Sequence, residues 1–306
     1  MLRPPALRPG ARIALVAPSS PVHPPERVDA ALARIAALGF RPELSPHARE
    51  AHGHLAGRDE ARAADLNAAF ADPDLGAIWC LRGGAGALRL LPLLDFAALT
   101  EHPKPFIGYS DATALHAAIQ RHAGLVSFHG PIVVECREGD EEHALFELIM
   151  GRDRRALSLA GERSRCVHGG SASGPLVGGN LTVLVRLLGT PFEPSFDGAI
   201  LALEDVSEAP YRVDNMLTQL RLSGRLQRVA GIVAGSFGTA PESLRPQFSY
   251  EEIVSERCGD LGIPVMTGAR FGHEGAQFTL PMGAEVEMNA DAGSLCLPAP
   301  AVIVNE

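Results

Sequence analysis

A serine at a possible strand-to-helix turn is the first candidate for chemistry in this chain. Ser110 stands in KPFIGYSDATAL, where a short apolar run meets Gly-Tyr-Ser-Asp-Ala and a helix-favouring segment follows. Gly108 to Ala112 is close to the G-x-S-x-G nucleophile elbow, with Ala112 in place of the second glycine. An ordinary serine that caps the next helix fits the same residues. The motif therefore predicts either a nucleophile or a helix cap.

A glycine loop precedes this serine. The residues RGGAG, 82–86, follow the apolar run AIWCL. Consecutive glycines at a strand end let a ligand approach the backbone, and open N–H groups can hold an anion. The loop lacks the GK[ST] of a P-loop, and its spacing misses G-x-G-x-x-G because position 89 is arginine. It is either a source of an oxyanion donor, a phosphate loop or a tight turn.

A nucleophilic serine needs a base, and histidine is the usual one because its pKa lies near the operating pH. The chain has 11 histidines. His273, in ARFGHEGAQF, stands between glycines after the strand-like IPVMTG, where it could reach the site of another domain. A single histidine is more often structural, and five others stay alternatives or structural residues: His52, His54, His116, His122 and His129.

The base in turn needs an acid to orient it. Glu204 closes the apolar strand ILAL and begins EDVSE. A carboxylate at the end of a buried strand is costly unless it has a partner. Asp205 and Glu208 are alternatives in the same stretch, and a surface pair between Glu204 and Arg212 is the structural alternative. The residues alone do not choose among them.

These candidates need an alternating fold to position them. From residue 12 to about 150, short apolar runs alternate with helical periods, which predicts βαβ units and a mostly parallel sheet. Gly39 stands where a helix would end. The expected strands lie within 11–20, 77–83, 104–111 and 125–133, and the expected helices within 25–40, 57–74, 88–99 and 112–124.

A second region follows a polar stretch. Residues 151–175 are rich in Gly and Ser near their end and indicate a linker with at most one strand. Beyond it, strands are expected within 200–206 and 229–237, helices within 209–224 and 251–262, and hairpin-like strands over 276–297. We therefore predict two domains, the first of them an α/β domain with a mostly parallel sheet over 1–155 that carries Ser110. A linker over 156–174 and a β-rich α+β domain over 175–306, which carries Glu204 and His273, complete the prediction.

Composition excludes several classes of protein. A net charge of −9 argues against nucleic-acid and anionic-membrane partners, which need clustered Lys and Arg. No apolar run approaches the roughly 18 residues of a membrane span, and the run 13–17 is too short for a signal peptide, so we expect a soluble cytoplasmic protein. Five scattered cysteines fit neither a disulfide framework nor a zinc pattern. We expect no metal and no cofactor.

With these pieces assembled, the sequence resembles the LD-carboxypeptidase family of serine peptidases, which includes murein tetrapeptide carboxypeptidases and microcin C self-immunity proteins. The similarity runs over nearly the whole chain. It is carried by IALVAPSSP, LRGGAGALRLLPLLD, PFIGYSDATALH, FHGP, VGGNLTVL, LALEDVSEAPYRVDNMLTQL and GHEGAQFTLPMGAEVEM. Their order and joint presence are more specific than any one of them.

The resemblance implies a catalytic triad of Ser110, Glu204 and His273, with backbone N–H groups of Gly84 and Asp111 as oxyanion donors. It implies hydrolysis of an amide by acyl transfer, with release of terminal D-alanine from a cytoplasmic muropeptide during peptidoglycan recycling. The resemblance implies an N-terminal α/β sandwich that carries the serine, a smaller C-terminal domain that supplies the acid and the base, and a site at the interface of the two domains. It also suggests a homodimer.

Two residues of the glycine loop concern the substrate. Arg82, or another cation, is expected to meet the new terminal carboxylate of the substrate. Many relatives carry an aromatic residue where this chain has Ala85, so the shape of the neighbouring pocket is left open.

Three other functions compete with this reading. A relative of the immunity proteins would cleave an aminoacyl-nucleotide amide, but those proteins stack a base on aromatic side chains, and this chain has 5% aromatics and one tryptophan. A non-catalytic phosphate- or nucleotide-binding module would use RGGAG and a helix N-terminus. A cysteine enzyme with Cys80 as nucleophile is disfavoured, because position 78 is isoleucine where an elbow needs glycine.

Overall fold

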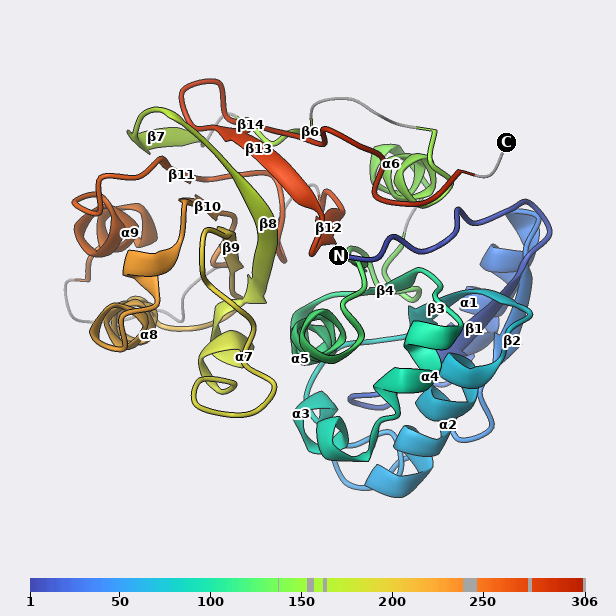
Figure 1. Ribbon diagram of the computed structural model, residues 1–306. Coiled ribbons are helices and arrows are strands. Elements are labelled where there is room, and N and C mark those ends of the chain that lie inside the picture. Colours follow the sequence, from blue (N-terminus) through green and yellow to red (C-terminus); the bar gives the residue numbers. More distant parts are fainter. Residues whose placement is uncertain (137, 153–156, 162–163, 239–246, 275–276, 305–306) are drawn as a thin grey trace. The chain divides into compact units, whose positions relative to one another are not determined.

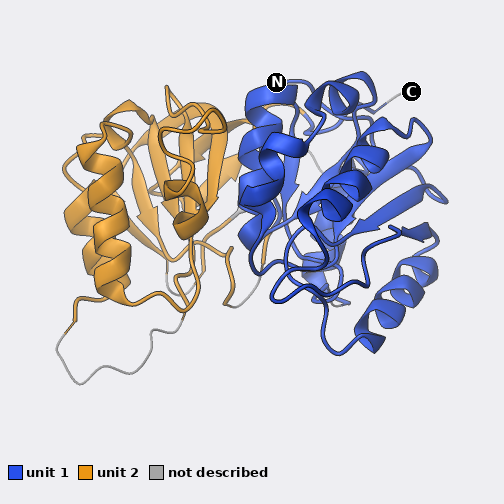
Figure 2. Ribbon diagram, turned by 90° about the horizontal axis from the view of Figure 1, so that it is seen from below, with its two compact units in different colours: residues 1–153, 279–282, 300–306 blue, residues 154–278, 283–299 orange. Residues whose placement is uncertain are grey.

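The chain forms two compact units in a computed structural model. Unit 1 comprises residues 1–153, 279–282 and 300–306, and unit 2 comprises residues 154–278 and 283–299 (Figure 2). The structure describes residues 1–136, 138–152, 157–161, 164–238, 247–274 and 277–304.

Unit 1 is an α/β sandwich around one six-stranded sheet with the order β12-β5-β4-β3-β1-β2 (Figure 1). All neighbouring pairs are parallel except β12 with β5. Its strands are β1 (Arg12–Val16), β2 (Arg41–Leu44), β3 (Leu75–Cys80), β4 (Phe106–Gly108), β5 (Ser127–His129) and β12 (Leu280–Met282). Its helices are α1 (Glu26–Ala37), α2 (Asp59–Ala71), α3 (Ala87–Leu90), α4 (Phe96–Glu101), α5 (Thr113–Ala118) and α6 (Asp140–Ile149).

The central strands are buried along nearly their whole length, as expected for parallel strands covered on both faces. Strand β3 reads LGAIWC, and Trp79 in it is fully buried, with its indole N–H donating to the carbonyl of Pro131 at 2.7 Å. Helix α1 packs Val28, Ala31 and Ile35 inward, and Gly39, at φ +83°, follows its end. Apart from residues 88–99, the strands and helices expected over 11–133 are found at positions that overlap their predicted ranges.

One expected helix, residues 88–99, is broken in two. Helix α3 runs into a 3-10 turn over Leu91–Leu93, and α4 begins only at Phe96. Pro92 lacks the N–H that would continue an α-helix, and the carboxylate of Asp95 accepts from the N–H groups of Ala97 and Ala98, which starts a new helix.

Unit 2 contains an eight-stranded sheet with the order β6-β14-β13-β8-β9-β10-β11-β7. Strands β8 to β11 are parallel, and the remaining pairs are antiparallel. Its strands are β6 (Leu157–Ser158), β7 (Arg165–His168), β8 (Ser171–Asn180), β9 (Ile200–Glu204), β10 (Gly231–Ala234), β11 (Val265–Thr267), β13 (Glu285–Asn289) and β14 (Ser294–Cys296). Its helices are α7 (Leu181–Val185), α8 (Pro210–Leu222) and α9 (Tyr250–Cys258).

The core of unit 2 lies between its parallel strands and these helices. Leu201 and Leu203 of β9 share one apolar cluster with Val213, Leu217 and Leu220 of α8. The mixed sheet with few helices agrees with the expected β-rich α+β class.

Further features of the chain differ from the expected element pattern: strand β2 and helix α7 were not expected. Helix α6 was not anticipated. The polar stretch 151–175 contributes β7 and part of β8, besides β6. Within 276–297, β13 and β14 do form an antiparallel hairpin, but β12 pairs with β5 in unit 1 (Leu280 opposite His129). The division into 1–155, 156–174 and 175–306 stays a prediction, and the compact units add that residues 279–282 and 300–306 pack in unit 1.

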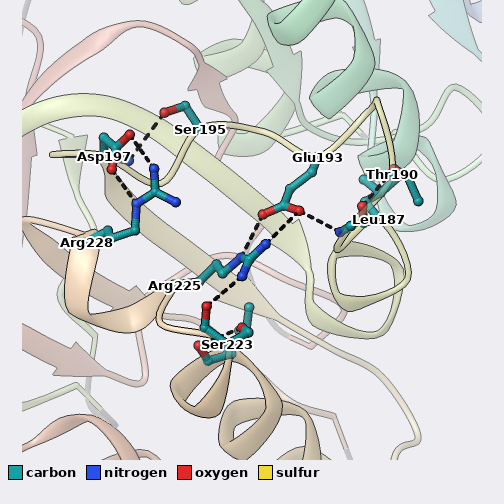
Figure 3. A network of polar contacts seen from close by, with 10 residues as sticks. Leu187, Thr190, Glu193, Ser195, Asp197, Ser223, Arg225 and Arg228 are labelled. Atoms are coloured by element: carbon teal, nitrogen blue, oxygen red, sulfur yellow. Dashed lines mark hydrogen bonds and ion pairs between the residues drawn. The ribbon is translucent and has the colours of Figure 1, made fainter.

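Two arginine–carboxylate pairs hold the loop that leads from α7 to β9 (Figure 3). Arg225 donates to both oxygens of Glu193, at 2.8 and 3.1 Å, and Glu193 also accepts from the N–H of Gly189 at 2.6 Å. Arg228 pairs with Asp197. The first pair is largely shielded, with 26% and 16% of the two side chains exposed, whereas the second exposes 48% and 61%.

Glu193→Gln is expected to lower the free energy of unfolding by about 1 kcal/mol at pH 7, because a shielded bidentate pair is lost. The hydrogen bond from Arg225 holds the pKa of Glu193 below its usual 4.5. The stabilisation is therefore fully present above pH 4.5 and disappears as the pH falls through the lowered pKa. Urea unfolding of wild type and variant between pH 3 and pH 7 measures this.

The matched control for this loop is Asp197→Asn, which removes the exposed pair and should change stability far less. An equal loss in both variants, or a difference for Glu193→Gln that does not shrink as the pH falls below 4.5, would contradict the assignment.

Candidate active site

The turn after β4 has the geometry of an elbow. Ser110 adopts a left-handed backbone conformation, with φ +62°, and begins a 3-10 turn over Ser110–Ala112 before α5. A Cβ atom added at Gly108 would lie 3.0 Å from the Cβ of Ala112 and 2.9 Å from the Sγ of Cys80, so both ends of the turn need small residues. The N-cap of α5 is Ala112, and Ser110 therefore does not occupy the capping position of that helix.

A buried histidine stabilises this turn by hydrogen bonds. His116 is 1% exposed, and burial lowers its pKa to about 4, so the ring is neutral at pH 7. Its Nε2 lies 2.8 Å from the carbonyl oxygen of Gly108 and its Nδ1 2.8 Å from Ser127 Oγ. Because a carbonyl only accepts, Nε2 carries the proton and Nδ1 accepts from the serine. His116 is a structural residue of the elbow.

The glycine loop 82–86 lies directly against Ser110. A Cβ atom at Gly83 would sit 3.0 Å from the Cβ and 3.3 Å from the Oγ of Ser110. Gly84 has φ +111° and is exposed, as is Ala85, whose N–H donates to Ser20 Oγ at 3.2 Å. Arg82 is half-buried and donates from Nη1 to the carbonyl of Pro21 at 2.8 Å. The loop thus presents backbone beside the serine.

Unit 2 carries a buried acid–histidine pair. Glu204, the last residue of β9, is completely buried, and its Oε2 lies 2.6 Å from His273 Nδ1. A carboxylate accepts, so Nδ1–H donates and Nε2 is left as the basic nitrogen. Burial raises the pKa of Glu204, and the hydrogen bond from His273 opposes that rise. Arg212, the structural alternative, instead pairs with Glu208 at 3.4 Å.

Glycine before the histidine makes this close approach possible. Gly272 has φ +114°, and a Cβ atom there would lie 3.1 Å from the Cβ of Glu204 and 2.4 Å from Ser236 Oγ. The loop is tied to the end of β10, since the N–H of Ser236 donates to Phe271 O and the N–H of Glu274 to Ser236 Oγ. The imidazole retains 13% exposure, whereas the carboxylate has none.

Asp205, the acid next to Glu204, forms hydrogen bonds to the start of a helix. Asp205 accepts from Asn180 Nδ2 at 2.9 Å and from both the N–H and the hydroxyl of Thr182, at 2.8 and 2.7 Å. It therefore anchors the start of α7. Asn180 also accepts from the N–H of Val183 as the N-cap of that helix. The sequence did not single out Asn180, although VGGNLTVL has the Asn-x-x pattern of a cap.

Cys80, the alternative nucleophile, has surroundings that do not suit catalysis. Cys80 is fully buried and burial raises its pKa, so it is no thiolate nucleophile. All five cysteines are free. A second histidine–acid pair, His47 Nδ1 with Asp65 Oδ1 at 2.8 Å, joins the loop after β2 to α2 and was missed from the sequence.

Within the described ranges of the chain, no group of three or more His, Cys, Asp and Glu side chains could hold a metal ion. No helix there has the length and apolar character to cross a bilayer.

The left-handed backbone at Ser110 predicts an order of stability between two variants. Ser110→Gly should be more stable than Ser110→Ala by about 0.5–1 kcal/mol, because a left-handed residue other than glycine costs about 1–2 kcal/mol and the flexibility of glycine cancels part of the gain. Thermal and urea unfolding measure the difference. At Ser171 in the extended strand β8 the order should reverse, and the same order at both positions would count against a strained elbow.

Glu204→Gln tests the buried carboxylate. The charged form is disfavoured by burial, so the folded pKa lies above 4.5 and the folded state binds the proton more tightly than the unfolded chain. The free energy of unfolding of wild type minus that of Glu204→Gln should therefore increase as the pH falls from 7 towards 4.5. Unfolding free energies at several pH values measure this, and a relative stability that falls over the same range would contradict it.

The comparisons with known proteins cover both units. The model of the LD-carboxypeptidase N-terminal domain matches residues 13–130, and that of the C-terminal domain matches residues 173–288. A putative carboxypeptidase of Streptomyces coelicolor is 40% identical, over 99% of this chain and 98% of its own. A probable murein peptide carboxypeptidase of Bacillus subtilis is 37% identical, over 94% and 91%.

Solved structures of two other proteins have the same fold as this chain. A muramoyltetrapeptide carboxypeptidase from Oxalobacter formigenes has a TM-score of 0.83 at 31% identity, covering 95% of this chain and all of the other. A microcin C7 self-immunity protein in complex with glutamyl sulfamoyl guanosine has a TM-score of 0.89 at 22% identity, covering 99% and 100%, and shows the shared fold. From both domain models and these relatives, the chain belongs to the LD-carboxypeptidase family.

Proposed function

We propose that the protein is a serine peptidase that hydrolyses an amide bond by acyl transfer and releases terminal D-alanine from muropeptides. The observation that supports this most is the strained elbow at Ser110, with its glycine loop, in a chain of this family that also holds a buried Glu204–His273 pair. A serine in such a turn exposes its hydroxyl and the N–H groups that follow. The pair has the arrangement that makes a histidine a general base.

In this proposal Ser110, His273 and Glu204 form one triad. Glu204 holds the His273 ring with Nδ1 protonated, so Nε2 takes the proton from Ser110 as its oxygen bonds to the substrate carbonyl carbon. His273 then gives that proton to the leaving amine as the C–N bond breaks. Water, activated by the same nitrogen, cleaves the ester and restores Ser110.

The N–H groups of Gly84 and Asp111 would hold the oxyanion. Both residues flank the serine, one in the loop beside it and one directly after it. Removing one such donor in other enzymes costs about 10²–10³ in rate. The placement of the glycine loop therefore matters nearly as much as the triad.

The muropeptide substrate is supported by the relatives named for murein peptides. The alternative, an aminoacyl-nucleotide amide, needs an aromatic surface for the base. The single tryptophan, Trp79, cannot supply it, because it is fully buried in β3. Arg82 is the proposed partner of the new terminal carboxylate, and Ala85 is the proposed residue that sets the shape of the neighbouring pocket.

We also propose that the protein works in the cytoplasm, as part of murein recycling, and as a homodimer. Five free cysteines suit a reducing compartment. Light scattering on the purified chain measures the oligomeric state, and a monomer at micromolar concentration would contradict the dimer.

The direct test is hydrolysis of an L,D-tetrapeptide and of an aminoacyl-sulfamoyl nucleotide. We expect wild type to release D-alanine from the tetrapeptide, and Ser110→Ala and His273→Ala each to lower kcat by at least about 10³-fold, because members of a triad act as a unit. Glu208→Gln, a carboxylate in the same stretch as Glu204, serves as the matched control and should retain activity.

Each other outcome is decisive. Full activity in Ser110→Ala rules out the serine mechanism. Cleavage of the nucleotide alone identifies the aminoacyl-nucleotide function. If neither substrate is cleaved and the chain binds phosphate with or without Ser110, the non-catalytic module is correct.

A further inference from the structure

Asp111, the residue after the elbow serine, has a buried carboxylate that forms hydrogen bonds to two other segments of unit 1. Asp111 is 3% exposed, and its Oδ2 accepts from Ser19 Oγ at 2.6 Å and from the N–H of Ala87 at 2.8 Å. Ser19 follows β1, and Ala87 is the first residue of α3, directly after the glycine loop. One carboxylate oxygen thus joins three segments that are distant in sequence.

The same segments are joined by a second set of contacts. The N–H of Ser20 donates to the carbonyl of Gly83 at 3.2 Å, and Ser20 Oγ accepts from the N–H of Ala85 at 3.2 Å. A Cβ atom at Gly84 would lie 2.4 Å from that Oγ, so the loop is seated tightly on Ser20. Both ends of the glycine loop are therefore fixed to the loop after β1.

Capping of α3 alone does not explain this burial. Helix α3 has four residues, and Asp95 starts α4 with two backbone N–H bonds while it stays exposed. Taking a carboxylate out of water is costly unless its hydrogen bonds replace the solvent. The additional feature at Asp111 is its position between Ser110 and the glycine loop, where a Cβ atom added at Gly83 would lie 3.0 Å from the Cβ of that serine.

We propose that the Asp111 carboxylate is a positioning group that holds the glycine loop against Ser110. The inference rests on the proposed function, in which the N–H groups of Gly84 and Asp111 bind the oxyanion. Asp111 would then supply one donor through its backbone and fix the loop of the other through its side chain. The spacing of the two donors is set by one residue.

The consequence is an effect on the transition state rather than on substrate binding. Oxyanion donors act on charge that develops during the reaction, so loss of their alignment lowers kcat with little change in KM. Asp111→Ala keeps the backbone N–H of residue 111 and removes only the anchor. Asp111→Asn keeps an oxygen that can accept from Ala87 and Ser19.

The test uses the full chain and two readouts, tetrapeptide hydrolysis and amide hydrogen exchange by mass spectrometry over residues 83–87. We expect Asp111→Ala to lower kcat about 10- to 10³-fold with KM within threefold, and to speed exchange over 83–87 at least tenfold. Asp111→Asn should recover part of both. Asp95→Ala, which removes a carboxylate that also accepts from two backbone N–H groups, should change neither.

A second variant covers a failure of Asp111→Ala to fold. Ser19→Ala removes one donor to the same carboxylate and should show both effects in smaller measure. In the double variant Asp111→Ala/Ser19→Ala the two losses should not add, because they remove one interaction.

Two results would overturn the inference. Unchanged exchange over 83–87 in Asp111→Ala and Ser19→Ala means that the carboxylate does not hold the loop. Faster exchange with unchanged kcat means that the loop does not serve the reaction. If wild type cleaves no substrate while exchange still responds, the proposed function has failed and the anchoring of the loop by Asp111 stands.

Discussion

The left-handed backbone at Ser110 is the constraint around which unit 1 is arranged. Such a conformation costs about 1–2 kcal/mol for a residue with a side chain and persists only where the surroundings over-determine it. Here strand β4 is hydrogen-bonded on both sides, His116 donates to the carbonyl of Gly108, and small residues close both ends of the turn. The strain is local, and the packing that maintains it extends through the sheet.

In unit 2, the corresponding constraint is the burial of two adjacent carboxyl groups. Glu204 and Asp205 are adjacent and both almost completely buried, and although Asn180 interacts with both, their other partners differ. Asp205 is satisfied by Asn180 and Thr182 and anchors a helix, whereas Glu204 has the ring of His273. Asp205 is stabilised by neutral donors. Glu204 bonds to a histidine, whose ring can take up and release a proton. Adjacent residues of one type therefore acquire different chemistry from their neighbours in space.

Polar groups under the glycine loop connect the elbow to the rest of unit 1. Asp111, Ser19 and Ser20 join the loop after β1 to the loop after β3. All of these segments follow the carboxyl ends of parallel strands, where open α/β sheets place their functional loops. The parallel order β4-β3-β1 brings the three loops together.

The sequence by itself determined the local features. It placed the strands and helices of the parallel units, the small residues around Ser110 and the glycine before His273, because backbone propensity and turn chemistry depend on nearby residues. Family resemblance, rather than spacing, singled out Glu204 and His273. The tertiary structure showed that Glu204 meets His273 whereas Asp205 anchors α7. Only the tertiary structure gave His116 its hydrogen bond to Gly108, revealed the His47–Asp65 pair and placed β12 in the sheet of unit 1. Those outcomes depend on contacts between residues far apart in the chain, and a one-dimensional pattern does not encode which of several similar side chains will meet.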